Sequence, residues 1–313
     1  MEEKIIISGR NLHNIDPDLA VWHFPIALYL FLGGLAAGIL IFSAVTVIMD
    51  KQDKLPSSAR IAPLIVPILL SVGLLALIVD LTHKLYVWQL YMTIRIESPM
   101  SWGAWVLLIV TPLSFLWAFA DLRKVFPKID WKFPILYKLE ALINDYRKLL
   151  AWLLIPLCVI LGIYTGILLS AFNARPLWNT SILGPLFLTS GLSTAAAAII
   201  LFAKTDYEKH LISKIDIFLI IIELALIIHF VMTFYAGNET QIAAINILLS
   251  GNYAIMFFGL LLGVGLLLPL VLEVFELWGV KIPTYIPAIL ILIGGFVFRI
   301  LVTDAGQFSR ILY

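Results

Sequence analysis

Eight long apolar runs dominate this sequence and limit what it can fold into. A helix that crosses a bilayer needs about 20 consecutive, mostly apolar residues, and each run reaches that length between charged, proline-containing or polar breaks. The predicted spans cover residues 24–49, 61–80, 101–121, 147–170, 180–204, 212–236, 252–277 and 284–303. Long segments that alternate polar and apolar residues are absent from the sequence, which argues against a transmembrane β-barrel. The sequence therefore predicts an all-α integral membrane protein with eight transmembrane helices.

The composition supports a membrane protein and excludes several other classes. Of the 313 residues, 62% are hydrophobic and 13% are charged, against about 45–50% and about 25% in soluble chains. These values exclude a soluble enzyme domain and a disordered chain, and the net charge of +1 provides no basic field for nucleic acid. The single cysteine, Cys158, excludes disulfides and iron–sulfur or zinc sites with cysteine ligands from this chain alone.

The Lys and Arg residues predict how the chain is oriented in the membrane. The side that holds both termini and the loops 81–100, 171–179 and 237–251 carries seven of them, and the other side carries fourteen. Because cytoplasmic loops are rich in Lys and Arg, loop 122–148 is expected in the cytoplasm and both termini in the periplasm. Residues 1–22 lack the apolar core of a cleavable signal and are expected to form an amphipathic or irregular tail. The predicted location is the cytoplasmic (inner) membrane of a bacterium or archaeon.

An internal similarity indicates a duplication. Trp22 and Trp178 are each followed at the same spacing by Leu-Phe and a cluster of small residues. The two tryptophans are 156 residues apart, and a shift by 156 residues also places the second and third spans over the sixth and seventh. This predicts two four-helix bundles of the same orientation, residues 1–175 and 176–313. Chance similarity is the alternative, because small residues recur in membrane helices for packing alone.

Ionisable residues inside the spans are costly and mark functional positions. Glu223, near the middle of the sixth span, is either a proton-relay station or one half of a structural hydrogen bond between helices. Arg299 is expected to pair with a carboxylate, Asp304 being near it in sequence. If the chain moves protons, the candidate path uses Glu223, Glu273, Arg299 and Asp304.

The histidines do not suit a transmembrane pair of haems. His23, His83 and His229 all fall in the outer halves of the predicted spans or just beyond them, and none lies in an inner half. Two haems with paired histidine ligands need imidazoles at two depths, so a transmembrane pair is disfavoured. One haem at the outer side is the alternative, and our expectation is that this chain holds neither haem nor a metal.

The segment between the second and third spans combines polar groups with an apolar wall. Residues 84–96 are too polar to span and are expected to lie at the outer interface. The longer run 80–105 concentrates Asp80, His83, Arg95 and Ser98 beside an apolar wall. A quinone head needs hydrogen-bond donors, apolar room and titratable groups, and this segment offers all three. A simple belt of interfacial aromatic residues is the alternative.

Four stretches resemble a known family. Residues 97–105 contain Ser-Pro-Met-Ser-Trp-Gly, which resembles a motif of the polysulfide reductase membrane-subunit (NrfD-type) family. Residues 25–38, 164–179 and 294–307 resemble its first helix, its fourth helix with the following loop, and its last helix. The resemblance therefore extends in order over nearly the whole chain.

The resemblance implies a quinone-reactive membrane subunit of a respiratory oxidoreductase. Its menaquinone or ubiquinone would bind non-covalently in the N-terminal bundle near the outer face. Its partner would be a ferredoxin-like iron–sulfur subunit that connects to a molybdopterin catalytic subunit or a multihaem cytochrome, with proton translocation as an option. Tyr164 matches a family tyrosine, Asp80 matches a carboxylate at the end of the second helix, and Tyr29 stands where some relatives have histidine. The predicted quinone site is His23, Tyr29, Asp80, His83, Arg95, Ser98, Trp102 and Tyr164. A purely structural anchor and a transporter are the alternatives.

Overall fold

All eight predicted spans are helices. The computed structural model describes residues 22–309, so the predicted tail, apart from Trp22, lies outside the described residues. Within that range the regular structure is helical, and eight helices are long and apolar enough to cross a membrane. They are α1 (Phe24–Ile48), the continuous run of η2 (Ser57–Ile61), η3 (Ala62–Ile65) and α2 (Val66–Asp80), α4 (Pro99–Val125), α6 (Arg147–Ser170), α7 (Leu183–Phe202), α8 (Asp206–Tyr235), η5 (Ile255–Leu267) with α10 (Leu268–Leu277), and α11 (Tyr285–Phe308).

Four spanning helices extend beyond the residues that hydropathy predicts: the second span, α4, α8 and α11. α8 begins at Asp206, ahead of the predicted residue 212, since the Thr205 hydroxyl accepts a 3.3 Å hydrogen bond from the Glu208 N–H and caps the first turn. α11 continues past residue 303 to Phe308. Hydropathy locates the lipid core, whereas capping decides where the helix ends.

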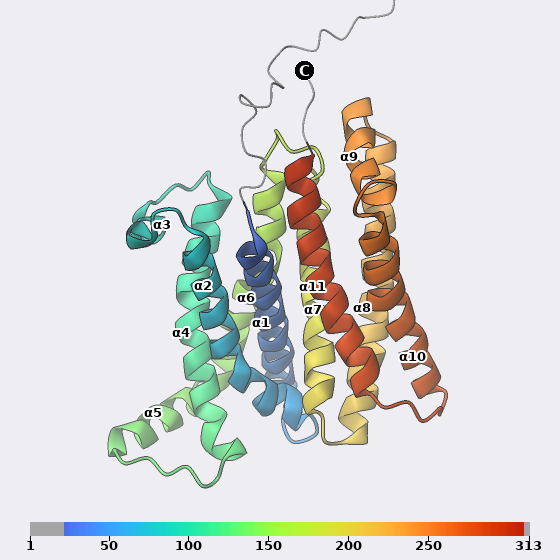
Figure 1. Cartoon of the computed structure of the whole chain (residues 1–313). Helices are drawn as coiled ribbons and strands as arrows, with labels where there is room; N and C mark the ends of the chain where they lie inside the picture. Colours follow the sequence, from blue (N-terminus) through green and yellow to red (C-terminus); the bar gives the residue numbers. More distant parts are fainter. Residues whose placement is uncertain (1–21, 310–313) are drawn as a thin grey trace, which may run out of the picture.

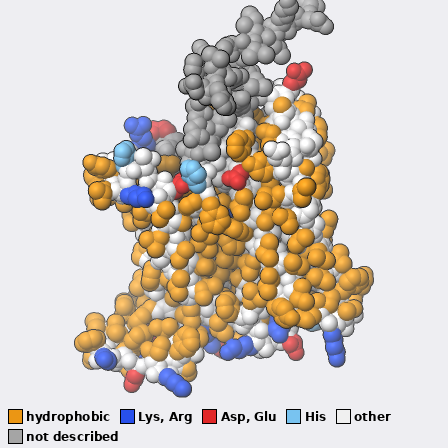
Figure 2. All heavy atoms as spheres, in the orientation of Figure 1, with side chains coloured by type: hydrophobic (Ala, Val, Ile, Leu, Met, Phe, Trp, Pro, Cys, Tyr) orange, Lys and Arg blue, Asp and Glu red, His pale blue; other side chains and the backbone are white. Residues whose placement is uncertain are grey.

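Three short helices lie at the two ends of the bundle (Figure 1). α3 (Trp88–Met92), which follows the turn η4 (Lys84–Tyr86), and α9 (Glu239–Leu249) lie at what we call the upper end, and α5 (Pro134–Asp145) lies at the lower end. The predicted interfacial segment 84–96 is thus two short helical turns that do not span. Between the two ends, hydrophobic side chains cover most of the visible surface (Figure 2).

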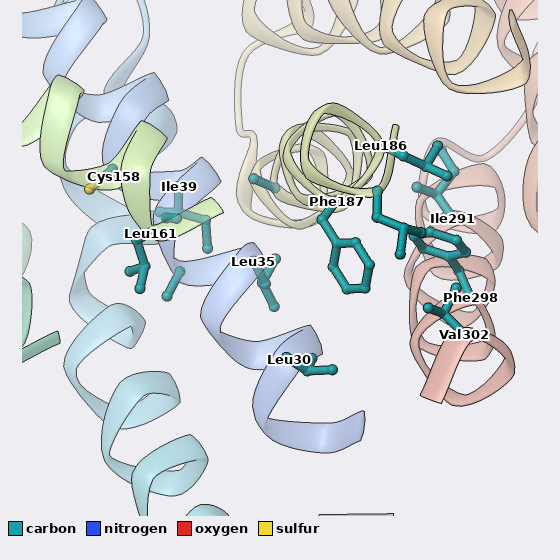
Figure 3. Packing of buried hydrophobic residues seen from close by; sticks show 14 of the residues in the cluster. Leu30, Leu35, Ile39, Cys158, Leu161, Leu186, Phe187, Ile291, Phe298 and Val302 are labelled. Carbon is teal, nitrogen blue, oxygen red and sulfur yellow. The ribbon is translucent and has the colours of Figure 1, made fainter. Parts of the chain in front are cut away.

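Helix α1 is central and packs against α2, α6, α7 and α11. Its contact with α7 is close, because a Cβ atom built on Gly38 would lie 2.5 Å from the Gly191 carbonyl oxygen and 2.6 Å from the Ala195 Cβ. Small residues allow such backbone approach in lipid. Figure 3 shows side chains of α1, among them Leu35, in the buried core between α6 and α7.

The lower end of the second span is held by a buried carboxylate. Glu208 on α8 accepts hydrogen bonds from the Ser57 and Ser58 N–H groups at 3.1 and 2.7 Å, and from the Ser58 hydroxyl at 2.9 Å. A negative charge at the start of a helix is favourable because the backbone N–H groups there lack intrahelical acceptors. This contact fixes α8 against η2.

The upper end joins the start of the described chain to its last helix. The Trp22 N–H donates to Oε1 of Gln307 at 2.6 Å, and Nε2 of Gln307 donates to the Trp22 carbonyl at 2.7 Å. The Trp22 ring stacks on Trp178, with the ring centroids 5.1 Å apart, and the Trp178 indole donates to the Val302 carbonyl at 2.7 Å. The chain therefore enters α1 from a position fixed by the loop before α7 and by α11.

Candidate functional site

A largely apolar cavity of about 300 Å³ opens near the upper end and is lined by residues of α1, α2, α3, α4 and α6. Most of its lining is aliphatic, with Leu30, Leu77 and Leu168 among the walls. Its polar lining residues come from several elements: Tyr29, Asp80, Thr82, Tyr91, Tyr164 and Thr165. The cavity thus has an apolar body with a few convergent polar groups, which is typical of a small-molecule site.

Two buried tyrosines meet in this cavity. The hydroxyls of Tyr29 on α1 and Tyr164 on α6 are hydrogen-bonded to each other, and both side chains are buried. Gly103 on α4 provides the room, because a Cβ atom there would overlap the Tyr164 ring. We did not predict this role of Gly103. The signal in the sequence that could have indicated it is the Ser-Pro-Met-Ser-Trp-Gly motif, of which Gly103 is the last residue.

Asp80 connects the cavity to an exposed imidazole. Nδ1 of His23 lies 3.3 Å from Oδ1 of Asp80. The Asp80 side chain is 11% exposed and lines the cavity, whereas the His23 side chain is 66% exposed. The pair can therefore pass a proton between the cavity and the solvent at the upper end.

A second cavity, of about 430 Å³, adjoins the first and contains three more predicted residues. His83, Arg95 and Ser98 line it, and the two cavities share lining residues that include Leu90 and Met100. The structure therefore brings these three together beside the tyrosine cavity rather than in it.

Trp102 lies in neither of these two cavities. Its indole donates to the Ile96 carbonyl at 2.7 Å, and the residue is 47% exposed. Tyr91, which we did not predict, lines the first cavity, and burial raises the pKa of its hydroxyl above the ordinary value.

The predicted proton-path residues separate into two places. Glu223 is 2% exposed on α8 and interacts electrostatically with Arg299 of α11. The Arg299 guanidinium lies over the Phe187 ring, 4.4 Å from its centroid, and donates to the Phe187 carbonyl at 3.0 Å. Among the described residues Arg299 forms no ion pair with Asp304, so that expected partner is wrong. Asp304 lies instead near Tyr253, whose pKa is raised by burial and by the charge of Asp304.

A row of buried carboxyl groups extends from Glu223 toward the lower end. Asp216, which we did not predict, accepts a 2.7 Å hydrogen bond from the Ser193 hydroxyl and interacts electrostatically with Glu223. Glu273 on α10 interacts with Asp216 and with Glu276. Neither Glu273 oxygen has a hydrogen-bond partner among the described residues.

The row ends near basic residues at the lower surface. Glu276 interacts electrostatically with His210 and Lys209, and all three line one groove. Four carboxyl groups thus connect this groove to the buried Arg299. Within residues 22–309, no three His, Cys, Asp or Glu side chains are grouped so as to hold a metal ion.

Eight spanning helices, with a largely apolar cavity that contains two tyrosines near one end, define a multi-pass membrane protein. The chain belongs to the family described as polysulphide reductase, NrfD, whose sequence model matches residues 13–310. The expected family is confirmed, and with it a multi-pass protein of the bacterial inner membrane.

Named relatives match along nearly their whole lengths. The C subunit of the polysulfide reductase of Wolinella succinogenes is 32% identical over 300 residues, which cover 92% of this chain and 94% of the relative. A protein NrfD homolog of Haemophilus influenzae is 30% identical over 309 residues, 92% and 95% of the two proteins. Protein NrfD of Escherichia coli is 30% identical over 312 residues, 92% and 96%.

Proposed function

We propose that this chain is the quinone-reactive membrane subunit of a respiratory oxidoreductase. It exchanges electrons between menaquinone or ubiquinone and an extrinsic iron–sulfur subunit. The observation that carries the proposal is the apolar cavity in which the Tyr29 and Tyr164 hydroxyls meet while Asp80 reaches toward solvent. A relative named as one part of a reductase supports a role within a complex.

The cavity residues fit a quinone. Its head needs a donor for a carbonyl oxygen, and the Tyr29–Tyr164 pair can supply the one hydroxyl hydrogen that is not used in their mutual hydrogen bond. The ring needs apolar walls, which Leu30, Leu77 and Leu168 supply. A volume of about 300 Å³ is at the lower limit of ligand pockets and suits the head alone. When bound, the quinone supplies two-electron, two-proton chemistry.

The chain's own residues orient the head and move protons. Tyr164 is fixed by the α4 backbone at Gly103 and directs its hydroxyl to the cavity. Asp80 holds or accepts a proton at its carboxylate, and His23 exchanges that proton with solvent through the 3.3 Å contact. His83, Arg95 and Ser98 line the adjoining cavity, where they contact the partner or the arriving quinone.

The partner docks at the upper end in this proposal, because electron transfer requires the quinone cavity to lie near the first cluster. The partner is a ferredoxin-like subunit that passes electrons to a molybdopterin subunit or a multihaem cytochrome. The excess of Lys and Arg in loop 122–148 at the lower end supports a periplasmic upper end in this proposal.

The two halves, residues 1–175 and 176–313, arose by duplication in this proposal. The contacts support it: α1 packs on α2 and α6, as α7 packs on α8 and α11. Trp22 and Trp178, which are related by the 156-residue offset, stand just before α1 and α7 respectively.

The test of the quinone site uses the purified complex. We expect bound quinone, no haem band in the redox-difference spectrum, and at least tenfold slower quinol turnover in Tyr164→Phe and Asp80→Asn. Tyr285→Phe, which removes a hydroxyl from an exposed tyrosine outside the two upper cavities, is the matched control. Normal quinol turnover in both cavity variants would indicate that the chain is only a structural anchor. A haem band would overturn the cofactor assignment.

We further propose that the carboxyl row carries protons from the lower end. Glu276, Glu273, Asp216 and Glu223 lead to Arg299, and Asp304 serves the upper side. In proteoliposomes Glu223→Gln is expected to keep quinol turnover and lose proton uptake per electron, while the exposed Glu239→Gln keeps both. An unchanged proton stoichiometry in Glu223→Gln refutes the relay. Solute flux without any redox partner would favour a transporter instead.

A further inference from the structure

A cavity at the lower end, opposite the quinone cavity, has a basic lining that neither proposed function uses. Its volume is about 290 Å³, and residues of α1, η2, α4, α5 and α6 and of the loop after α1 line it. Four basic side chains face two acidic ones: Arg60, Lys124, Arg147 and Lys148 against Asp121 and Asp145. The lining residues alone therefore carry two net positive charges, before Asp50 and Asp53, which pair with two of the cations from outside the lining, are counted.

Arg147 is the fixed element of this cavity. It is 8% exposed, its Nη2 is hydrogen-bonded to Asp121, and its guanidinium lies 3.9 Å from the centroid of the Trp117 ring. The Trp117 indole in turn donates to the Ser43 hydroxyl at 2.9 Å. Nη1 of Arg147 is buried and has no acceptor among the described residues. Buried donors nearly always have acceptors, because leaving one unpaired costs free energy, so Nη1 indicates a ligand with an oxygen acceptor.

The other cations are held loosely enough to turn toward a ligand. Lys148 pairs with Asp50 at 2.6 Å and Arg60 pairs with Asp53 at 2.8 Å. The two carboxylates are 66% and 93% exposed, and ion pairs of this kind contribute little because water screens them. Lys124 donates to Asn144 at 2.7 Å, and its Nζ also lies 3.4 Å from Oδ1 of the buried Asp121. A ligand with negatively charged oxygens can therefore replace these contacts.

The cavity lies where lipid headgroups lie. Helix α5, which lines one side of it, has a strongly one-sided distribution of apolar residues, and Ile135 and Leu142 on it are 67% and 53% exposed. Such a helix lies in the interface with its apolar side toward the acyl chains. Figure 1 shows α5 at the lower end of the bundle beside α4, and Figure 2 shows Lys and Arg side chains at this level.

We propose that this cavity binds the phosphate-bearing headgroup of an anionic phospholipid from the adjacent leaflet. Nη1 of Arg147 donates to a phosphate oxygen, and Arg60, Lys124 and Lys148 surround the charge. Basic pockets between membrane helices are suited to such headgroups, and arginine forms strong charge-assisted hydrogen bonds to phosphate. The headgroup lies between α4, α5 and α6 and closes the lower end of these helices.

The test measures lipid bound to the full-length chain isolated with its partner subunits. The variant is Arg60→Gln/Lys148→Gln, which leaves the Arg147–Asp121 pair intact. The control is Lys132→Gln/Lys138→Gln, which removes two exposed lysines of the same lower end that do not line the cavity. Delipidated protein is titrated with phosphatidylglycerol, with phosphatidylcholine and with inorganic phosphate, and bound lipid is counted by native mass spectrometry.

We expect wild type and control to retain one phosphatidylglycerol in preference to phosphatidylcholine. A cation near an anionic headgroup contributes a factor of about five in affinity, so the cavity variant is expected to bind about 25-fold more weakly. Arg60→Lys/Lys148→Arg, which keeps both charges, is expected to bind like wild type and shows that weaker binding reflects lost charge rather than misfolding. Unchanged phosphatidylglycerol binding in the Gln variant overturns the proposal. Displacement of the lipid by millimolar inorganic phosphate also overturns it and assigns the cavity to free phosphate.

Discussion

The substitution Gly103→Ala adds one methyl group beside the tyrosine pair and leaves both tyrosines unmutated. A Cβ atom at this position would lie 2.5 Å from Cδ2 and 2.7 Å from Cζ of Tyr164, whereas carbon atoms in contact are separated by about 3.5–4.0 Å. The Tyr164 ring must therefore move by roughly 1 Å. Because its hydroxyl is bonded to Tyr29, that movement also strains or breaks the hydrogen bond.

The expected cost follows from three contributions. Overpacking a close site costs about 1–3 kcal/mol, and loss of the tyrosine hydrogen bond costs about 1 kcal/mol more. The higher helix propensity of alanine offsets up to about 1 kcal/mol of this loss of stability. The free energy of unfolding is therefore expected to fall by about 1–3 kcal/mol. Quinol turnover should fall more steeply, since misplacing a positioning group by 1 Å can cost about a hundredfold in rate.

The chain contains a built-in probe for the stability measurement. Cys158 is the single cysteine of the sequence and is fully buried on α6, so a thiol-reactive dye reaches it when the helices separate. Thermal unfolding followed by this dye gives the stability, and steady-state quinol turnover of the complex gives the activity.

Gly33→Ala is the matched control, because a methyl group built on this membrane-helix glycine has no atom within 4 Å outside its own helix and chain neighbours. It is expected to leave turnover unchanged and to be neutral or slightly stabilising. If Gly103→Ala unfolds at the same temperature as Gly33→Ala and turns over quinol normally, the role assigned to this glycine is wrong.

Three further predictions test other contacts. Gly38→Ala is expected to lower the free energy of unfolding by about 1–3 kcal/mol relative to Gly33→Ala, because its methyl group would meet the α7 backbone; equal unfolding temperatures would contradict this. Arg147→Met is expected to cost about 3 kcal/mol, because it removes a partner of the buried Asp121 carboxylate, and Asp121→Asn in the same chain should recover part of that cost in dye-monitored unfolding. Burial raises the pKa of Tyr91 in the folded protein, so its contribution to the free energy of unfolding is complete below about pH 10 and falls as the pH rises further. Tyr91→Phe should therefore lose less stability than wild type between about pH 10 and pH 11. Parallel curves of unfolding free energy against pH for the two proteins would refute this.

The spans could be predicted because lipid leaves the backbone no alternative to a helix of sufficient length. The buried Asp216 could not, because in the predicted span 212–236 it falls in the first turns, where a charge reaches the interface. Only the cap at Thr205 starts α8 at Asp206 and places Asp216 well inside the helix. It is then seven residues, or about two turns, from Glu223 and on the same face.

Helix geometry also explains the two predictions that failed to bring residues together. Trp102 precedes Gly103 by one residue, which is a rotation of about 100°, so it points away when Gly103 faces Tyr164. Arg299 and Asp304 are five residues apart, whereas side chains meet on a helix at spacings of three or four. Rotation about the helix axis therefore decides which residues of the motif reach the cavity.

The Gln307 contact with Trp22 has a consequence for how the protein is made. Trp22 lines the cavity that contains Tyr29 and Tyr164, yet its backbone is held by the helix that leaves the ribosome last among those described. During synthesis the cavity therefore lacks one fixed wall until α11 has been inserted and docked. A polypeptide that has not yet inserted α11 therefore lacks the contact that holds the Trp22 backbone beside this cavity.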